Sequence, residues 1–265
     1  MTPISGRLIG AHQKIDRMAR RNLERIAPRC TFPDIRDILH FEGRQGPDAI
    51  KRKSPAKDEP WHYLQPFDPE DTKLIKLIEH HYRTLIRSLK NQDQVRASFE
   101  AAWLAHAIVD GLTPAHHYPY EEKLVELSGN DISQRTTIGK KLIIPGENAS
   151  RRISNNWKMW GPKGLFTTHA AFEWGVAVLI APLKSAPRRP TADKIAEFEA
   201  QPLDVWFRKV AQDVARLELY DAFYKTGWTI SLARRVRRQL TPMLVQAVSL
   251  VWYGAIREAY PERAV

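Results

Sequence analysis

The fold is decided by one stretch, His106-Ala-Ile-Val-Asp110-Gly-Leu-Thr-Pro114-Ala-His116. It closes a run over residues 93–111 in which Ala, Leu and Val dominate. A glycine and then a proline mark the end of this run, so the pattern predicts a helix. His106 and Asp110 are four positions apart, and both side chains therefore emerge on one helical face. Such groups are costly to bury without a partner, and both are common zinc ligands. The alternative is a core histidine bonded only to its neighbouring aspartate.

A second pair with the same spacing strengthens the metal interpretation. His169 and Glu173 lie four positions apart in an apolar run over residues 164–182, which also predicts a helix. His116 follows the stop signal of the first helix, where the chain can fold back over the same pocket. Two such pairs with a histidine between them favour a multi-metal site over two independent core histidines.

The composition limits the class of protein. A chain of 265 residues, 43% of them hydrophobic, can bury a large core. Its single cysteine, Cys30, excludes an internal disulfide framework. The first residues contain no apolar signal-peptide core, which predicts a cytoplasmic protein. The longest apolar stretch, residues 175–183, is too short for a transmembrane segment.

The net charge of +11 could attract phosphates, nucleic acid or anionic lipid. A peripheral contact with an anionic membrane is therefore one expectation, and a solvated basic surface is the other. Basic and aromatic side chains are mixed in the least regular part of the chain, residues 128–163, where they could shape the access of a substrate. These side chains are Arg151, Arg152, Trp157 and Trp160.

Most of the remaining sequence has a helical pattern. Apolar residues recur at helical spacing over residues 6–27, 68–90, 203–225, 229–240 and 242–260. Residues 42–60 are polar and rich in Gly, Pro and Lys, which predicts an exposed loop. A small hairpin is expected over residues 136–144, and a solvated helix face at His80 and His81. Together these patterns predict one all-α domain over residues 1–265.

The spacing His106-x3-Asp110-x5-His116, followed by His169-x3-Glu173 on the next long helix, resembles a known metal motif. It is the motif of the superfamily of zinc-dependent phospholipases C and fungal single-strand-specific nucleases. The glutamate at the last position resembles the phospholipase C branch. The resemblance implies an all-α, multi-helix domain with a multinuclear zinc cleft that holds two to three Zn2+ ions.

The resemblance also implies a first zinc site. His106 and Asp110 would share it with His62, which lies in Trp-His-Tyr, and with an aspartate near residue 34. Asp34 is preferred here over Asp37. It would serve both as a zinc ligand and as the candidate catalytic base.

Two further zinc sites follow from the same resemblance. His116, His169 and Glu173 would bind a second zinc ion. His12 would bind a third, with Asp110 as the bridge to the first site. The family completes this third site with the amine and carbonyl of an N-terminal tryptophan.

The N-terminus departs from that pattern, because no tryptophan precedes Trp61. Removal of Met1 would expose the amine of Thr2, whose unperturbed pKa is near 8, and this amine could chelate zinc instead. The alternative is a disordered tail over residues 1–5 that leaves the third site only partly filled.

The implied activity is hydrolysis of a phosphoric ester. A metal-activated hydroxide would attack the phosphorus of a phosphodiester, and zinc with nearby basic residues would neutralise the phosphoryl oxygens. A phospholipid is the favoured substrate. A single-strand nuclease or nucleotidase activity on nucleic acid is the alternative, and a catalytically lapsed, zinc-stabilised binding protein is another.

Overall fold

The computed structural model describes residues 10–28, 31–43, 46–48, 60–183 and 189–263, and shows no β-strand within them. The predicted all-α fold is confirmed in this part of the chain. The expected hairpin over residues 136–144 is wrong, because residues Ile138–Leu142 form the short helix α7, capped by the Thr137 side chain. None of the helices in these ranges is long and apolar enough to cross a membrane.

The helices follow one another with short connections. Up to residue 160 the chain contains α1 (Ala11–Ile26), α2 (Ile35–Glu42), α4 (Lys73–Lys90), α5 (Gln94–Gly111), the short helix η1 (Pro114–His117), α6 (Tyr120–Ser128), α7 and α8 (Ala149–Trp160). The rest of the chain contains α9 (Leu165–Ile180), α10 (Ala192–Glu199), α11 (Leu203–Ala215), α12 (Leu219–Thr226), α13 (Ile230–Arg235) and α14 (Thr241–Ala259). The helix predicted over residues 203–225 is thus divided into α11 and α12, with Glu218 at a positive φ of 48° between them.

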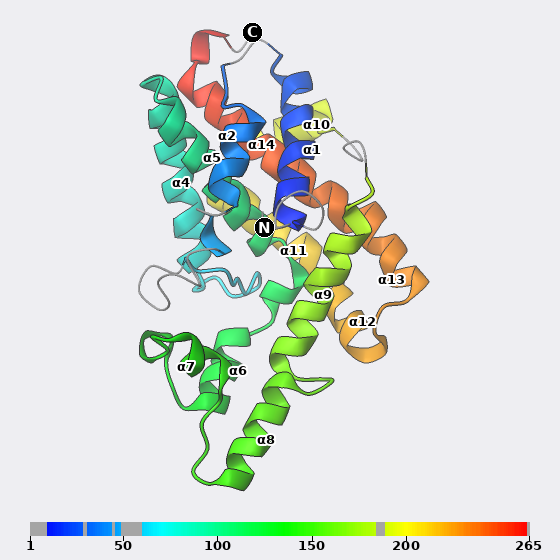
Figure 1. Cartoon of the computed structure of the whole chain (residues 1–265). Helices are drawn as coiled ribbons and strands as arrows, with labels where there is room; N and C mark the ends of the chain where they lie inside the picture. Colours follow the sequence, from blue (N-terminus) through cyan, green and yellow to red (C-terminus); the bar gives the residue numbers. More distant parts are fainter. Residues whose placement is uncertain (1–9, 29–30, 44–45, 49–59, 184–188, 264–265) are drawn as a thin grey trace, which may run out of the picture.

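Helices α5 and α14 form the centre of the main hydrophobic core. Helix α5 packs against α4 and α2, while α14 packs against α1 and α4 (Figure 1). Alanines at several positions of α5 allow this close packing. The indole of Trp252 on α14 is fully buried and donates to the carbonyl of Ala101 on α5 at 3.1 Å.

Two features fix the ends of α5. Asp93 accepts a hydrogen bond from the backbone N–H of Arg96 at 2.9 Å and so caps the start. At the other end a Cβ on Gly111 would lie 2.7 Å from side-chain atoms of Leu74 and Phe207. Only glycine fits there, because its neighbours approach its backbone closely. The chain then enters η1 and turns back beside the last turn of α5.

One prediction for α4 needs correction. His80 is exposed, as expected, but His81 is buried. The 3.6-residue period turns His81 toward α5, where its Nδ1 donates to the fully buried Glu100 carboxylate at 2.6 Å. The basic residues near His81 belong to the other faces of the same helix and do not solvate it.

Helices α6, α7 and α8 surround a smaller hydrophobic cluster at one end of the molecule (Figure 1). This cluster contains Tyr120, Leu124, Ile144 and Met159. Residues 128–163, the least regular part by sequence, therefore hold the α-helices α7 and α8 and the short helix η2 (Ile132–Gln134). Helix α9 runs from this end of the molecule toward the main core, and it carries His169 and Glu173 to the site described next.

Candidate metal centre

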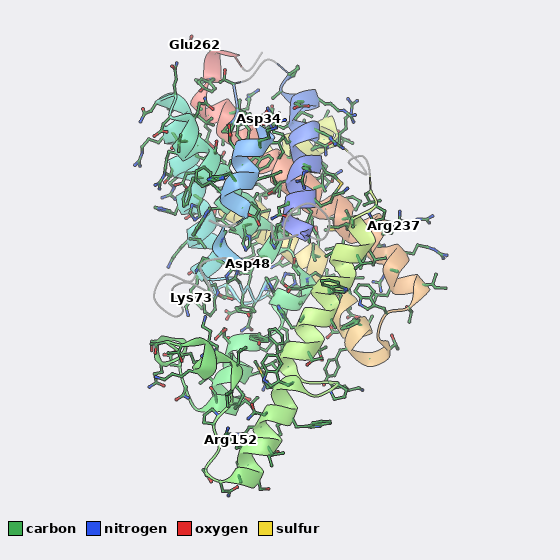
Figure 2. The ribbon with its side chains drawn as sticks, in the orientation of Figure 1. Asp34, Asp48, Lys73, Arg152, Arg237 and Glu262 are labelled. Carbon is green, nitrogen blue, oxygen red and sulfur yellow. The ribbon has the colours of Figure 1, made fainter. Side chains whose placement is uncertain are left out.

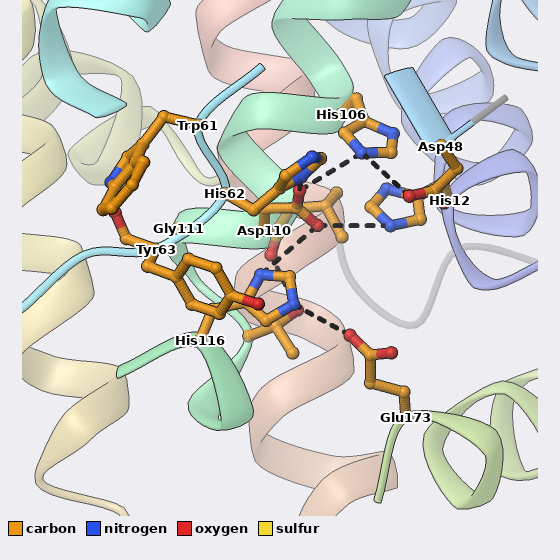
Figure 3. Close-up of polar contacts among 12 residues, drawn as sticks. His12, Asp48, Trp61, His62, Tyr63, His106, Asp110, Gly111, His116 and Glu173 are labelled. Carbon is orange, nitrogen blue, oxygen red and sulfur yellow. Dashed lines mark hydrogen bonds and ion pairs between the residues drawn. The ribbon is translucent and has the colours of Figure 1, made fainter. Parts of the chain in front are cut away.

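The structure gathers imidazoles and carboxylates from five parts of the fold around the last turn of α5 (Figure 3). His12 comes from the first turn of α1, and His62 from the extended segment before α4. His106 and Asp110 come from α5, and His116 from η1. His169 and Glu173 come from α9. Of the eight predicted site residues, these seven lie together: His12, His62, His106, Asp110, His116, His169 and Glu173.

Asp110 is the carboxylate at the centre of this group. It is 2% exposed, and its two oxygens contact four histidines. One oxygen bonds Nδ1 of His62 and lies 3.1 Å from Nε2 of His106. The other lies 3.4 Å from Nε2 of His12 and 3.5 Å from Nδ1 of His116. One carboxylate can therefore bridge two neighbouring ligand groups.

The charges around Asp110 hold it in the ionised form. Burial by itself raises the pKa of the Asp110 carboxyl, but the nearby His106, His116 and His62 lower this pKa well below its usual value. Burial also lowers the pKa of His106, but Asp110 and Glu42 raise it well above its usual value. A metal ion at His106 would thus take the place of a proton.

The first candidate metal group contains Asp48, His62 and His106, whose ligand atoms all lie within 4.8 Å of one another. Asp48 Oδ1 lies 4.0 Å from Nε2 of His106. Asp110 contacts both histidines and would supply a fourth ligand. Two histidines and two carboxylates form an ordinary tetrahedral shell for zinc.

The second candidate group is His116, His169 and Glu173. The Glu173 carboxylate accepts from Nε2 of His116 at 2.8 Å and lies 3.3 Å from Nε2 of His169. The two imidazole rings are stacked, with centroids 5.1 Å apart. Desolvation raises the pKa of Glu173, but His169 and His116 lower it well below its usual value. Three ligands with room for a fourth are typical of a catalytic zinc site.

His12 packs against the ring of His106. Its ring stacks on the His106 ring with centroids 4.0 Å apart, and its Nε2 faces Asp110. Nδ1 of this histidine makes no hydrogen bond within the described residues. A buried ring nitrogen without a partner suits a metal ligand better than a packed core residue. The predicted role of the Thr2 amine at this third site falls on residues 1–9, outside the described residues.

Asp34 does not join the group, and its assignment as zinc ligand and catalytic base is wrong. It is the exposed N-cap of α2 and accepts from the backbone N–H of Arg36 at 2.8 Å. The centre meets α2 at its opposite end, Glu42, about 12 Å away along an eight-residue helix. Figure 2 shows Asp34 far from Asp48. Asp37, the other candidate, is also exposed, in the first turn of α2.

Two acidic residues that sequence reasoning missed contact His106. Asp48 belongs to residues 42–60, which the pattern assigned to an exposed loop, and it is indeed 61% exposed. Glu42 is buried and accepts from Nδ1 of His106 at 3.0 Å. No periodic signal marks either one, because both reach the site through non-local folding. The only local indication was that Glu42 is an acidic residue at the end of the short helix α2.

Aromatic side chains close one side of the centre. The rings of Tyr63 and Tyr120 are stacked 5.5 Å apart, and both lie against imidazoles of the second group. A cleft of about 330 Å³ opens on the other side. His12, Asp48, Asp110, His116, His169 and Glu173 line it, and Trp174 lies at its mouth. The centre is therefore dry on one side and reachable from solvent on the other.

Fold and site together define an all-α protein with a buried, multi-histidine centre whose clustered imidazoles and carboxylates could bind metal. Among solved structures, the chain is similar to the alpha-toxin of Clostridium perfringens from the avian strain SWCP, with a TM-score of 0.50 and 11% sequence identity. The match covers 97% of this chain, which spans 60% of the toxin chain. No family model and no curated protein matches the sequence. At this identity the similarity shows the fold, and it agrees with the fold implied by the phospholipase C resemblance.

Proposed function

We propose that the protein is a zinc-dependent phosphoric ester hydrolase of the phospholipase C type. One observation carries the proposal: Asp110 touches ligands of the Asp48–His62–His106 group and of the His116–His169–Glu173 group at once. His62, His106 and Asp48 would hold one ion with it, and His116 would hold the next ion with the α9 pair. Paired metal ions are one arrangement that enzymes use to hydrolyse phosphoesters, and a carboxylate between two ligand groups suits such a pair.

The residues around the centre would have separate roles in the reaction. When zinc is bound at these ligands, it polarises a phosphoryl oxygen and lowers the pKa of a coordinated water. Glu42 holds the His106 ring in one orientation. Tyr63 and Tyr120 exclude water from the second group. Asp48, exposed at the cleft and close to His106, is placed to accept a proton from the attacking water.

A phospholipid is the proposed substrate, in line with the resemblance to the phospholipase C branch. A single-strand nuclease or nucleotidase is the second candidate. The observation that favours it is Trp174, which lines the cleft and is 60% exposed, because an exposed indole can stack a nucleobase.

One assay with measured zinc content separates these activities. The purified protein is tested on a chromogenic phosphocholine ester, on lecithin and on single-stranded DNA. Turnover of the first two supports the phospholipase proposal, and cleavage of DNA alone supports the second candidate. Bound zinc without turnover of any substrate would identify a zinc-stabilised binding protein and contradict both.

Variants tie the activity to the centre. His106→Ala and Asp110→Asn should each reduce turnover by at least about a hundredfold and lower the zinc content, because both remove direct ligands. His80→Ala, on an exposed face of α4, is the control and should keep both. Normal zinc content and turnover in Asp110→Asn would overturn the assignment.

A further inference from the structure

Helix α8 presents its apolar stripe to solvent and its amides to the protein. Ile153 is 71% exposed and Trp157 68% exposed, and Trp160 continues this face one turn later. On the inner side, the Asn156 amide donates to the carbonyl of Ile144 at 2.7 Å and accepts from its N–H at 3.1 Å. A surface helix ordinarily buries its apolar residues. Here Met159 is the buried apolar residue of α8, and Ile153 and Trp157 form an apolar face that the protein leaves uncovered.

The stripe continues onto α9. The rings of Trp160 and Phe166 lie 4.6 Å apart and join the two helices. Further along α9, Trp174 and Val178 are also exposed, and they share one helix face because they lie four positions apart. We name these exposed side chains the apolar ridge, and its members are Ile153, Trp157, Trp160, Phe166, Trp174 and Val178.

The ridge leads to the candidate metal centre. Trp174 lines the mouth of the cleft, next to His169 and Glu173 of the same helix. Helices α8 and α9 follow each other along one side of the molecule, with α8 at the outer end (Figure 1). A surface that lies against the ridge would therefore also face the cleft.

Basic side chains accompany the ridge. Residues 132–172 contain seven Lys and Arg and a single acidic residue, Glu147. Arg151, Arg152 and Lys158 on α8 are exposed, and Lys163 is exposed in the turn before α9. Figure 2 shows Arg152 at the outer end of α8. Exposed indoles with neighbouring Lys and Arg are typical of surfaces that lie in the headgroup region of a bilayer.

We propose that the apolar ridge docks the protein on an anionic phospholipid bilayer and holds the cleft against the lipid headgroups. This inference deepens the proposed function and rests on it for the role of the lipid as substrate. The charge argues against a second copy of the chain as the occupant. A two-fold contact through the ridge would bring the same basic residues of both copies together, whereas anionic headgroups complement them.

The test measures binding to vesicles apart from catalysis. Protein is sedimented with sucrose-loaded vesicles of phosphatidylcholine and phosphatidylserine in equal parts, and with vesicles of phosphatidylcholine alone. The ridge variant is Ile153→Gln with Trp157→Gln. The matched control is Val205→Gln with Val95→Gln, because these two apolar residues are also exposed, at 51% and 70%, but lie on α11 and α5 rather than on α8 or α9.

We expect the wild type to bind the mixed vesicles more tightly than the neutral ones, and the ridge variant to bind them roughly tenfold more weakly. The control variant should bind like the wild type. Turnover of a soluble chromogenic phosphocholine ester should be equal in all three proteins, while turnover of vesicle lipid should fall only in the ridge variant.

Other outcomes would overturn the inference. Equal vesicle binding by the wild type and the ridge variant would do so. The inference would also be overturned if sedimentation velocity showed a dimer for the wild type and a monomer for the ridge variant. The ridge would then be a subunit contact. Vesicle binding is measured without turnover, so it tests the docking surface even if the protein hydrolyses no phosphoester. Asp110→Asn, which should lose turnover, should still bind vesicles through the ridge.

Discussion

Nδ1 of His106 donates to the buried carboxylate of Glu42 at 3.0 Å, so Nε2 of the same ring points at Asp110. A carboxylate on the far nitrogen fixes both the tautomer and the ring orientation of a metal-binding histidine and makes it a stronger ligand. Glu42 thus acts on the metal centre through His106.

Replacing Glu42 tests this role. Glu42→Gln keeps the size of the side chain but removes its charge, and we expect zinc affinity to fall by about tenfold. Competition with a chromophoric chelator measures the change, and circular dichroism checks the helix content. Glu24→Gln, an exposed glutamate on α1, is the control. An unchanged zinc affinity in Glu42→Gln would show that the Glu42–His106 hydrogen bond does not affect metal binding.

The paired variants Asp48→Asn and Asp34→Asn decide which aspartate serves the centre. Asp48→Asn should lower zinc stoichiometry and reduce phosphoester turnover by about a hundredfold or more, because it removes a negatively charged ligand. Asp34→Asn should leave both unchanged, and stability too, since asparagine caps a helix as well as aspartate does. Zinc loss in Asp34→Asn with normal zinc in Asp48→Asn would reverse the assignment.

The adjacent histidines of α4 should respond differently to substitution. His81→Ala removes the partner of the fully buried Glu100 carboxylate, which Arg96 also contacts. We expect a loss of about 2 kcal/mol in the free energy of unfolding. The exposed His80→Ala should change it by less than about 0.5 kcal/mol. Urea denaturation measures the free energy of unfolding of both variants. Equal losses would mean that the buried His81–Glu100 hydrogen bond does not contribute to stability.

Zinc binding should release protons. Because the pKa of His106 is raised well above 6.5 without metal, zinc displaces a proton there at neutral pH. Zinc affinity should therefore increase with pH until the pH passes the raised pKa of His106. Calorimetric titration in buffers of different ionisation enthalpy counts the protons. Glu42→Gln should reduce this release, and a heat that does not depend on the buffer would refute the prediction.

His106 and Asp110 contribute opposite pH dependences to the stability of the metal-free protein. The raised pKa of His106 contributes stability that is fully present below pH 6.5 and is lost as the pH rises through the folded value. The lowered pKa of Asp110 contributes stability that is present above pH 3.8 and is lost as the pH falls through its folded value. Thermal melts without metal should be highest between these limits, and a maximum above pH 8 would contradict this.

The parts of the site that could be predicted from the sequence are those with a local signal. His106 with Asp110, and His169 with Glu173, are pairs on single helices, and helical spacing alone puts each pair on one face. His62 and His12 came from a family resemblance, and the fold brought both to Asp110. Asp34 failed because an aspartate before a helix serves equally well as a cap, and the sequence does not distinguish the two uses.

By itself, the sequence determined the all-α class and the two His–carboxylate pairs, since both depend on periodicity within one segment. Only the tertiary structure decided that Glu42 and Asp48 face His106, that His81 turns inward and that the α8 stripe faces solvent. The physical reason is that helical periodicity defines the faces of a helix. Which face is buried depends on the helices that pack against it, and these come from distant parts of the chain.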